Sequence, residues 1–357
     1  MRRVLITGGA GFIGANFLHH WLKSHPQDRV VMLDALTYAG SRLNFKEAEG
    51  RSNFRFVHGD ICDEQLVNQL MREEKIDTVA HFAAESHVDR SIDGPDAFIK
   101  TNILGTHSLL KAAKAEWAGK QGDFRFHHVS TDEVYGSLSP TDPAFHEHTP
   151  YDPSSPYSAS KASSDHLARA YQRTYGLPVT LTNCSNNYGP FQFPEKLIPV
   201  IILNALAGRP IPVYGDGDQV RDWLYVTDHC TAIETVIQRG KLGETYNVGG
   251  NGERKNIEIV RTICKLLDER RPDSQHRPHE ALIKFVQDRP GHDRRYAIDI
   301  RYIKKELGWQ PAEDLGSGLA KTVDWYLAHL DWCATVAGQN AGTERLGLHQ
   351  APTGARR

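Results

Sequence analysis

Short apolar stretches of strand character alternate with helical stretches through the first half of the chain. The strand candidates are RVLITG (3–8), RVVMLDAL (29–36), FRFVHGD (54–60), TVAHFAA (78–84), FRFHHVS (124–130) and VTLTNCS (179–185). Helices are expected between them, near 12–25, 63–74, 95–118 and 156–175. Almost continuously apolar strands that alternate with helices are typical of a parallel sheet covered on both faces. This pattern predicts an α/β fold with a doubly wound parallel sheet of the Rossmann type.

A glycine-rich turn follows the first predicted strand and leads into the first predicted helix. It reads TGGAGFIG and contains Gly8, Gly11 and Gly14. Glycines at this spacing let the backbone approach a pyrophosphate, which then lies at the N-terminus of the helix. The second strand ends at Asp34, 20 residues after Gly14, where an acid hydrogen-bonds the adenosine ribose. Because a carboxylate there repels a 2′-phosphate, we predict NAD as the cofactor rather than NADP. A tight turn in another α/β protein is the alternative interpretation.

The character of the sequence changes after about residue 187, where Pro, Gly and aromatic residues become frequent. Helices are expected near 196–207, 228–239, 256–269 and 315–330, with a short strand at 244–250. We predict an NAD-binding domain of residues 1–187 and 222–250, and a smaller, mixed α/β substrate domain of residues 188–221 and 251–336. Residues 337–357 are polar and Gly-rich, so we expect them to form a mobile tail.

The composition is that of a globular protein without a strong overall charge. Of the 357 residues, 39% are hydrophobic and 24% are charged, and the formal net charge is −2, so we expect no nucleic-acid or membrane partner. No apolar run approaches the roughly 20 residues of a membrane span, and glycines interrupt the apolar N-terminus too early for a signal peptide. Five widely spaced cysteines without a CxxC pair favour reduced thiols in a cytoplasmic protein. The sequence has no HExxH motif, and none of its Cys and His residues are spaced as zinc ligands, so we predict no metal site.

Two motifs supply groups that can move protons. The fifth strand candidate ends near Thr131, and two adjacent carboxylates follow, Asp132 and Glu133. Adjacent like charges repel, so this pair is either a solvated loop or a pair with a chemical task. The helix expected at 156–175 carries Tyr157 and Lys161 on one face. A nearby ammonium and the positive charge of NAD⁺ would lower the pKa of the tyrosine and make it a usable base, and Thr131 could hold the same substrate hydroxyl.

The combination of TGGAGFIG, STDEVYG and YSASK resembles the extended short-chain dehydrogenase/reductase family. Within that family the chain resembles the dTDP-glucose 4,6-dehydratases, through AAESHVDRSI, STDEVYG, NCSNNYGPFQFPEKLIP, PVYGDGDQVRDWLYV and DRPGHDRRYAID. The match runs from about residue 3 to residue 330. The stretch 137–153 is shorter than in close relatives, but no functional residue is lost with it.

This resemblance implies a reaction on dTDP-glucose that yields dTDP-4-keto-6-deoxyglucose for deoxysugar biosynthesis, for example of rhamnose. The sugar is oxidised at C4 with NAD while Tyr157 takes the hydroxyl proton, water is lost across C5 and C6, and the hydride returns to C6. The water loss needs an acid beside a base, and two adjacent carboxyl groups supply both because their pKa values split. The resemblance assigns Glu133 as the C5 base and Asp132 as the C6 acid, and implies that NAD stays bound.

The resemblance also carries over binding residues, one position at a time. The expected cofactor contacts are Gly8, Gly11, Phe12, Ile13, Gly14, Asp34, Leu36, Thr37, Asp60, Ile61, Phe82, Ala83, Ala84, Glu85, Thr101, Tyr157, Lys161 and Asn187. The expected substrate contacts are Ser86, Thr131, Asn186, Glu195, Lys196, Leu197, Pro212, Val213, Tyr214, Arg221, Asn256, Arg289, His292 and Tyr296. Arg221 is expected at the diphosphate, since a guanidinium suits bidentate phosphate recognition. Plainer alternatives are an ion pair of Arg221 with Asp222, a core position for Leu197 and a solvated charge for Lys196.

Two other functions share parts of this pattern. A nucleotide-sugar 4-epimerase or decarboxylase would also use the glycine turn and the Tyr/Lys pair, but an epimerase needs no C5 acid/base pair and a decarboxylase needs no leaving-group acid. A non-catalytic NAD-binding regulator usually lacks the tyrosine or the lysine, and this chain has both as Tyr157 and Lys161. The resemblance further implies a homodimer formed by helices of the NAD-binding domain, including the helix that carries Tyr157.

Overall fold

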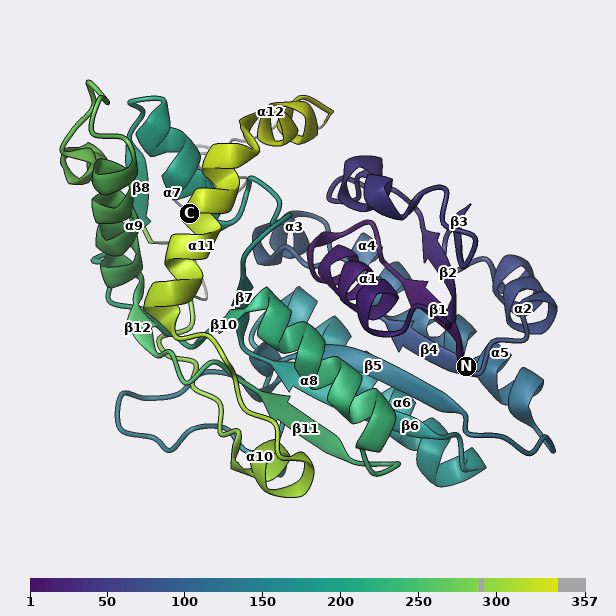
Figure 1. The fold of residues 1–357 in the computed structure, drawn as a ribbon. Coiled ribbons are helices and arrows are strands. Elements are labelled where there is room, and N and C mark those ends of the chain that lie inside the picture. Colours follow the sequence, from purple (N-terminus) through teal and green to yellow (C-terminus); the bar gives the residue numbers. More distant parts are fainter. Residues whose placement is uncertain (289–291, 340–357) are drawn as a thin grey trace, which may run out of the picture.

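The computed structural model describes residues 1–288 and 292–339. Its centre is a seven-stranded sheet with the strand order β11-β6-β5-β4-β1-β2-β3, in which every pairing is parallel. The strands are β1 (Arg3–Thr7), β2 (Arg29–Asp34), β3 (Phe54–His58), β4 (Thr78–His81), β5 (Arg125–Thr131), β6 (Val179–Cys184) and β11 (Thr245–Val248). The predicted α/β fold is therefore confirmed, and all seven predicted strands belong to this sheet (Figure 1).

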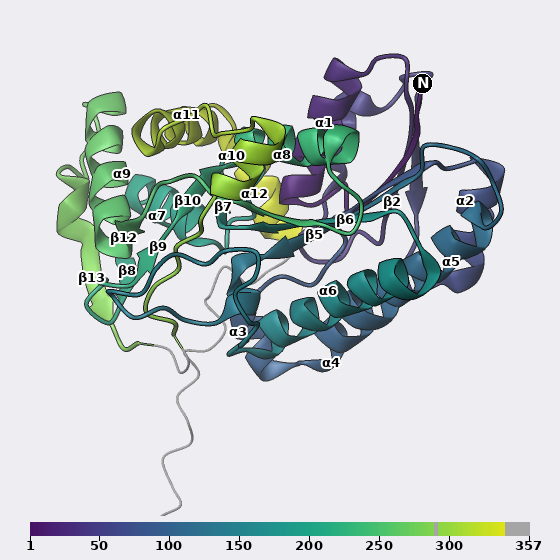
Figure 2. The same ribbon diagram turned by 90° about the horizontal axis from the view of Figure 1, so that it is seen from below.

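Helices cover both faces of the sheet (Figure 2). One face carries α1 (Phe12–Ser24) and α8 (Val226–Arg239), and the other carries α2 (Glu64–Glu73), α5 (Thr106–Trp117) and α6 (Pro156–Tyr175). Apolar side chains of both helix sets pack on the strands, such as Trp21 on one face and Leu109 on the other. The helix predicted at 95–118 is divided, because the short helix α4 (Asp96–Phe98) and the π-helical turn η2 (Ile99–Gly105) precede α5. None of the described helices is long and apolar enough to span a membrane.

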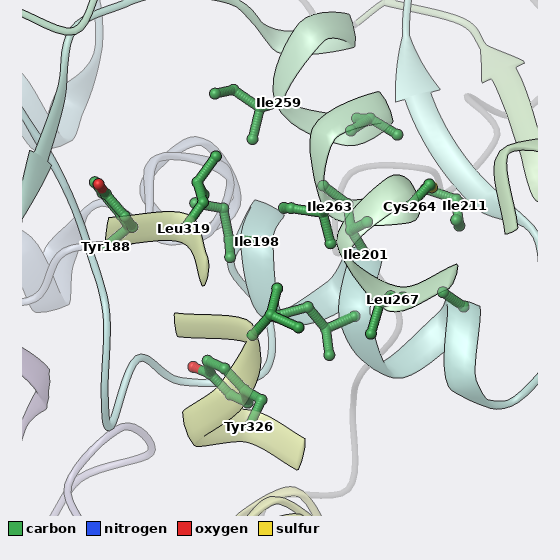
Figure 3. Packing of buried hydrophobic residues seen from close by; sticks show 14 of the residues in the cluster. Tyr188, Ile198, Ile201, Ile211, Ile259, Ile263, Cys264, Leu267, Leu319 and Tyr326 are labelled. Atoms are coloured by element: carbon green, nitrogen blue, oxygen red, sulfur yellow. The ribbon is translucent and has the colours of Figure 1, made fainter. Parts of the chain in front are cut away.

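A smaller body, here called the small lobe, packs beside the sheet and its helices. It consists of α7 (Leu197–Leu206), β8 (Ile211–Tyr214), α9 (Asn256–Arg270), β13 (Ile283–Val286) and α11 (Leu315–Ala328). β8 and β13 form a parallel pair. Apolar residues of α7, α9 and α11 meet in a core of their own, which includes Ile201, Ile263 and Tyr326 (Figure 3).

Shorter elements connect the sheet to the small lobe. β7 (Asn186–Tyr188) pairs with β10 (Trp223–Tyr225), and β9 (Val220–Arg221) pairs with β12 (Arg254–Lys255). The remaining elements are the 3₁₀ turns η1 (Arg42–Ala48), η3 (Asp132–Tyr135) and η4 (His279–Leu282) and the helices α3 (Val88–Asp93) and α10 (Arg301–Leu307). Neither α3 nor α10 has a counterpart in the sequence prediction.

The C-terminal helix α12 (Leu330–Gln339) corrects the predicted tail. The sequence placed the last helix end near 330 and a mobile tail from 337, whereas α12 continues to Gln339. It forms because Trp332, Cys333 and Val336 share one helix face and are buried with the small-lobe core. The rest of the predicted tail, 340–357, lies outside the described residues.

Candidate active site

A large cavity lies at the carboxyl ends of the central strands. It is lined by the glycine turn after β1, the ends of β2, β4, β5 and β6, the first turns of α6 and the segment 184–196. The strand order reverses between β1 and β4, and doubly wound sheets bind their ligands at such a reversal. The topology therefore makes this cavity the candidate active site.

Most of the predicted cofactor contacts line this cavity. Those that do are Gly8, Gly11, Phe12, Ile13, Gly14, Asp34, Thr37, Asp60, Ile61, Phe82, Ala83, Ala84, Glu85, Thr101, Tyr157, Lys161 and Asn187. Leu36 is not among the lining residues. Its N–H donates to Asp34 Oδ1 at 2.8 Å, and its side chain packs against core residues of the sheet, so Leu36 shapes the turn rather than the cavity wall.

The glycine turn has no room for side chains at two positions. Gly8 has a φ of +73°, and a Cβ atom on Gly14 would lie 2.2 Å from the Gly8 carbonyl oxygen. The backbone N–H of Ala10 donates to Asp34 Oδ2 at 2.9 Å. Burial raises the pKa of Asp34, although the hydrogen bonds from Ala10 and Leu36 oppose this. A close turn at the start of α1 beside a buried acid fits a dinucleotide, with its pyrophosphate on the turn and its ribose at Asp34.

Helix α6 begins at a well-formed N-terminus. The Ser155 side chain accepts the N–H of Ser158 at 3.1 Å, and the Ser158 hydroxyl accepts the N–H of Ser155 at 3.1 Å. Pro156 occupies the first turn, and Gly176 ends the helix with a φ of 67°. Ser155 thus caps this helix and fixes the turn that carries Tyr157.

Tyr157 and Lys161 lie one turn apart on α6, and both are buried at the cavity wall. The Lys161 ammonium donates to the Val129 carbonyl at 2.9 Å, and burial lowers its pKa. The Tyr157 hydroxyl is hydrogen-bonded to Thr131. Burial, and then the Glu133 carboxylate, raise the pKa of Tyr157 well above its usual range. In the chain alone the phenol is shielded from solvent and has an acidic side chain nearby, and the fall expected from the ammonium together with NAD⁺ stays a prediction.

The two adjacent carboxylates lie in different surroundings. Asp132 is only 1% exposed, and its Oδ2 atom has no hydrogen-bond partner among the described residues. Burial raises the pKa of Asp132 well above its usual range, and the charges of Glu133 and Asp222 raise it further. Glu133 is partly buried, and its N–H donates to Thr131 Oγ1 at 3.3 Å, which caps the turn η3. A solvated loop is thus excluded for Asp132, and the pair consists of a buried carboxyl group with a raised pKa beside a partly buried one.

The predicted substrate contacts divide into two groups. Ser86, Thr131, Asn186, Glu195 and Lys196 line the cavity. The residues outside its lining are Leu197, Pro212, Val213, Tyr214, Arg221, Asn256, His292 and Tyr296. Arg289 lies outside the described residues. The first group borders the catalytic side chains, and the second comes from the small lobe and from the segments that join it to the sheet.

Two of the plainer alternatives can be judged from the side-chain contacts. The Lys196 ammonium donates to the Ser86 carbonyl at 3.2 Å, so Lys196 is held at the cavity rather than only solvated. Leu197 is partly buried and packs against the small-lobe core, as its alternative interpretation stated. Val213 is 3% exposed in the same core, which leaves its backbone as the part that can reach a ligand.

Arg221 and Tyr296 lie beside the two carboxylates. Arg221 is buried and donates to the carbonyls of Val220 at 2.8 Å and Asp293 at 2.9 Å. Its guanidinium carbon lies 4.3 Å from the centre of the Tyr296 ring. The Arg221 charge acts to lower the pKa of Asp132, so this guanidinium is close to the Asp132/Glu133 pair.

Sequence reasoning missed part of the cavity wall. The missed lining residues are Leu33, Ala35, Tyr38, Ala39, Gly40, Gly59, Val129, Ser130, Cys184, Ser185, Gln192 and Phe193. Most of them lie at or just after the carboxyl ends of parallel strands, a position that was itself a usable signal. Gln192 and Phe193 come from an irregular segment with no such signal. Among the described residues no group of three or more His, Cys, Asp or Glu side chains could hold a metal ion.

The sequence matches the family model of GDP-mannose 4,6 dehydratase over residues 5–322. A dTDP-glucose 4,6-dehydratase of Xanthomonas campestris pv. campestris (strain B100) is 58% identical over 347 residues, which are 96% of this chain and 98% of that relative. The crystal structure of a dTDP-glucose 4,6-dehydratase from Streptomyces venezuelae, with NAD and TYD bound, has a TM-score of 0.85 at 46% identity and covers 94% of this chain and 99% of its own. A UDP-glucose 4-epimerase of Thermotoga maritima with UDP-glucose has a TM-score of 0.80 at 28% identity, over 92% of this chain and 99% of its own. The chain therefore belongs to the GDP-mannose 4,6 dehydratase family and, within it, to the dTDP-glucose 4,6-dehydratases.

Proposed function

We propose that this chain catalyses the NAD-dependent dehydration of dTDP-glucose to dTDP-4-keto-6-deoxyglucose, a hydro-lyase reaction of deoxysugar biosynthesis. One observation carries the proposal: the glycine turn, the Tyr157/Lys161 pair and the Asp132/Glu133 pair all line the same cavity. Relatives named dTDP-glucose 4,6-dehydratase at 53% to 58% identity over nearly the whole chain support it.

The cavity residues fit NAD as the resident cofactor. The turn between Gly8 and Gly14 brings the backbone at the start of α1 close to a pyrophosphate. Asp34 accepts hydrogen bonds from ribose hydroxyls and disfavours a 2′-phosphate. When bound, NAD supplies a hydride acceptor for the sugar C4 and a hydride donor for C6, so the net reaction needs no external reductant.

Tyr157 and Thr131 prepare the C4 hydroxyl for oxidation. Because these two side chains are hydrogen-bonded to each other, one substrate hydroxyl can contact both. A raised pKa leaves little of Tyr157 as the phenolate that acts as the base, so proton removal by Tyr157 depends on positive charge nearby. Lys161 holds one such charge in the cavity wall, and the oxidised cofactor brings another.

Asp132 and Glu133 perform the loss of water. Oxidation at C4 makes the C5 proton acidic, and Glu133 removes it. Asp132 keeps its proton because burial raises its pKa, and it gives that proton to the C6 hydroxyl as it leaves. The unpartnered Oδ2 atom of Asp132 supports this role, since a buried carboxyl oxygen without a partner can be directed at a ligand.

The nucleotide end of the substrate belongs to the small-lobe side of the molecule. Arg221 is proposed as the diphosphate ligand, because its guanidinium lies close to the catalytic pair. The rings of Tyr214 and His292 meet edge to face at 6.0 Å, and Asn256 Oδ1 is buried with no partner among the described residues. These groups offer an aromatic surface and a hydrogen-bond acceptor for the base and sugar of the nucleotide.

A 4-epimerase would share the fold, but its reaction is not expected to need the Asp132/Glu133 pair. The compared epimerase is 28% identical to this chain, while the compared dehydratases are 46% and 58% identical. An epimerase returns the hydride to C4 and has no task for a protonated Asp132. A decarboxylase has no leaving hydroxyl, and a non-catalytic NAD-binding regulator needs neither carboxylate.

The proposed division into domains follows the two bodies of the fold. Residues 1–187 and 222–250 would form the NAD-binding domain, and residues 188–221 and 251–336 the nucleotide-sugar domain. The membership of β11 in the large sheet supports the assignment of 222–250. The separate core of α7, α9 and α11 supports the assignment of the other two segments.

We also propose a homodimer through helices on the α6 side of the sheet. Ile99 and Leu104 of η2 are 47% and 56% exposed, and Ile92 of α3 is 49% exposed. Both elements pack against α6, and exposed apolar side chains that gather in this way mark an interface. Sedimentation of Leu104→Lys with Ile99→Lys should show a monomer. Leu242→Lys, which replaces a 42% exposed leucine elsewhere, should leave the dimer intact.

A cytoplasmic location is proposed from the cysteines. The five cysteines, Cys62, Cys184, Cys230, Cys264 and Cys333, are all free thiols, and four of them are buried. Thiols that stay reduced suit a reducing compartment.

Mass spectrometry of the purified protein with dTDP-glucose, without added reductant, tests the proposed function. A product lighter by one water, with no net accumulation of NADH, is the expected result. An unchanged mass with an epimerised sugar would assign the chain to the epimerases. Absence of turnover with NAD bound would favour the regulator.

A further inference from the structure

A chain of buried hydrogen bonds joins the C-terminal helix α12 to the glycine turn. The indole N–H of Trp332 donates to Asn44 Oδ1 at 2.8 Å. The Asn44 side-chain N–H donates to the Ala10 carbonyl at 2.7 Å, and the Ala10 N–H donates to Asp34 Oδ2 at 2.9 Å. Trp332 is 9% exposed and Asn44 is 2% exposed. The amide of Asn44 thus connects the last helix of the described chain with a peptide that lies between the glycines of the turn.

Aromatic packing holds Trp332 in this position. Its ring lies 5.1 Å from that of Trp325 and 6.0 Å from that of Phe191. Phe191 also stacks on His19 of α1 at 5.9 Å, so the cluster rests on the helix that the glycine turn opens. Figure 1 shows α12 leaving the end of α11 toward the N-terminal segments. The contacts of α12 therefore reach both the turn and its helix from outside the sheet.

The glycine turn depends on such outside contacts. Glycines have more backbone freedom than other residues, and this freedom must be lost before their N–H groups can hold a pyrophosphate. Both backbone groups of Ala10 are fixed. Its carbonyl accepts from the Asn44 side chain and from the Ser41 N–H at 3.1 Å, and its N–H donates to Asp34. Asp34 is the proposed ribose ligand. The position of Asn44 therefore affects the pyrophosphate and the ribose contacts together.

We propose that Trp332 is a positioning residue for NAD: through Asn44 it holds the glycine turn and Asp34 in the conformation that binds the cofactor, and so slows NAD release. This inference rests on the NAD-dependent reaction proposed above. In that reaction the hydride taken from C4 must return to the same sugar, so cofactor that leaves between the two steps ends the cycle. Trp332 touches neither sugar nor cofactor in this account and acts only through Asn44.

Release of NAD from the purified holoenzyme tests the inference directly. Trp332→Phe removes the indole N–H but keeps an aromatic ring in the cluster. The matched control is Trp117→Phe, because the Trp117 indole N–H also donates at 2.8 Å, to the Ile76 carbonyl, and Trp117 is 5% exposed. After rapid gel filtration, the protein-bound NAD is followed over time by chromatography of denatured samples. Trp332→Phe should release NAD on the order of 5- to 10-fold faster than wild type, the effect of about one buried hydrogen bond, and Trp117→Phe should not.

Asn44→Ala provides the second variant and a test of connectivity. It should also speed NAD release, and the double variant Asn44→Ala with Trp332→Phe should release NAD no faster than Asn44→Ala alone. Additive effects would mean that Trp332 acts by another route and would overturn the proposal. If Trp332→Phe does not fold, Asn44→Ala still decides whether the contact to Ala10 controls retention.

The remaining outcomes separate this inference from the function on which it rests. Wild-type protein that neither carries nor binds NAD would contradict the proposed function itself. Wild type and Trp332→Phe that retain NAD equally would overturn the role of Trp332 and leave the function standing. Equal acceleration in Trp332→Phe and Trp117→Phe would show a general loss of stability and would also overturn the inference.

Discussion

Asp132 lies in surroundings unlike those of a surface carboxylate. It is 1% exposed, its Oδ2 atom has no partner among the described residues, and the charges of Glu133 and Asp222 act against its ionisation. Burial is the largest cause of its raised pKa. A carboxyl group that keeps its proton can protonate a leaving hydroxyl, and the same surroundings make Asp132 costly to ionise.

The substitution Asp132→Asn should separate the oxidation from the loss of water. The amide keeps the shape of the side chain but cannot give up a proton, so water loss should slow by roughly 10²- to 10⁴-fold while C4 oxidation continues. In a single turnover, absorbance of bound NADH should rise and persist, and mass spectrometry should show a 4-keto sugar that has kept its water. Equal loss of both steps would contradict the assigned role.

The substitution Glu133→Gln should abolish the exchange of the C5 proton. Without the carboxylate the proposed C5 base is missing, so sugar recovered after incubation with the enzyme in deuterium oxide should carry little deuterium at C5, and little dehydrated product should form. Nuclear magnetic resonance of the recovered sugar measures this. Persistent exchange would identify a different base.

The raised pKa of Asp132 also predicts how stability depends on pH. Between the unfolded-state value near 3.8 and the higher native value, the native state holds a proton that the unfolded state has lost, so this group makes stability fall as pH rises. Asp132→Asn cannot ionise. Its free energy of unfolding relative to wild type should therefore increase as pH rises from the unfolded-state value toward the higher native value, as measured by urea titration. A difference that does not change with pH would show that Asp132 ionises normally.

The site position of a single residue was predictable where its local sequence determines it. Gly14 was predicted from the glycine-rich turn, which leaves no room for a Cβ atom, and Tyr157 and Lys161 were predicted from their spacing on one helix face. The raised pKa of Tyr157 in the chain alone was not predicted, because burial and Glu133 act against the fall expected from Lys161 together with NAD⁺. Burial comes from packing between distant segments, and sequence spacing does not report it.

At the level of elements, the N-terminus of α6 positions Tyr157, the proposed base for the C4 hydroxyl. Ser155→Ala removes the side chain that accepts the Ser158 N–H and should lower the free energy of unfolding by about 1 kcal/mol. Urea titration measures the loss. Ser163→Ala is the matched control, since its hydroxyl bonds only the Ala159 carbonyl of the same helix, and it should change stability by less than half as much. Equal losses of stability in the two variants would mean that the Ser155 cap stabilises the helix no more than an ordinary side-chain hydrogen bond does.

The elements that sequence analysis missed are those fixed by tertiary contacts. The π-helical turn η2 lies where a Cβ atom on Gly105 would approach Ile61 to 2.5 Å, a contact between segments far apart in the chain. Helix α12 was not predicted as a helix, because its apolar face is short, yet Trp332 finds a partner in Asn44. The strands of the sheet and the helices that cover it could be predicted without knowledge of tertiary contacts, because their apolar pattern repeats along the chain.

At the level of the whole molecule, NAD should stabilise the fold by mass action. At a free concentration about 100 times its Kd, a ligand bound only by the native state adds about 2.7 kcal/mol. Cofactor-stripped protein should therefore melt earlier, and added NAD should restore the melting temperature in calorimetry. NADP should restore much less, because Asp34 opposes its 2′-phosphate. Equal restoration by the two would refute the assignment of Asp34.

The two sides of the cavity differ in how far sequence could predict them. Its sheet side follows from the parallel topology, which brings the strand ends together. Its other side depends on Gln192 and Phe193, which are placed by contacts such as the hydrogen bond from the Tyr326 hydroxyl to the Gln192 carbonyl. Those contacts arise only when α11 packs against a segment more than a hundred residues earlier in the chain.

The parallel sheet also determines how this protein can be attached to a surface. All seven strands run the same way, so β1 begins at Arg3 on the edge opposite the cavity and ends at the glycine turn that lines it. A linker joined ahead of Arg3 would present the cavity to the solution. A linker joined just after α12 would pull on the helix whose Trp332 contacts Asn44. Immobilised catalysts built on this chain should therefore be anchored through the N-terminal end.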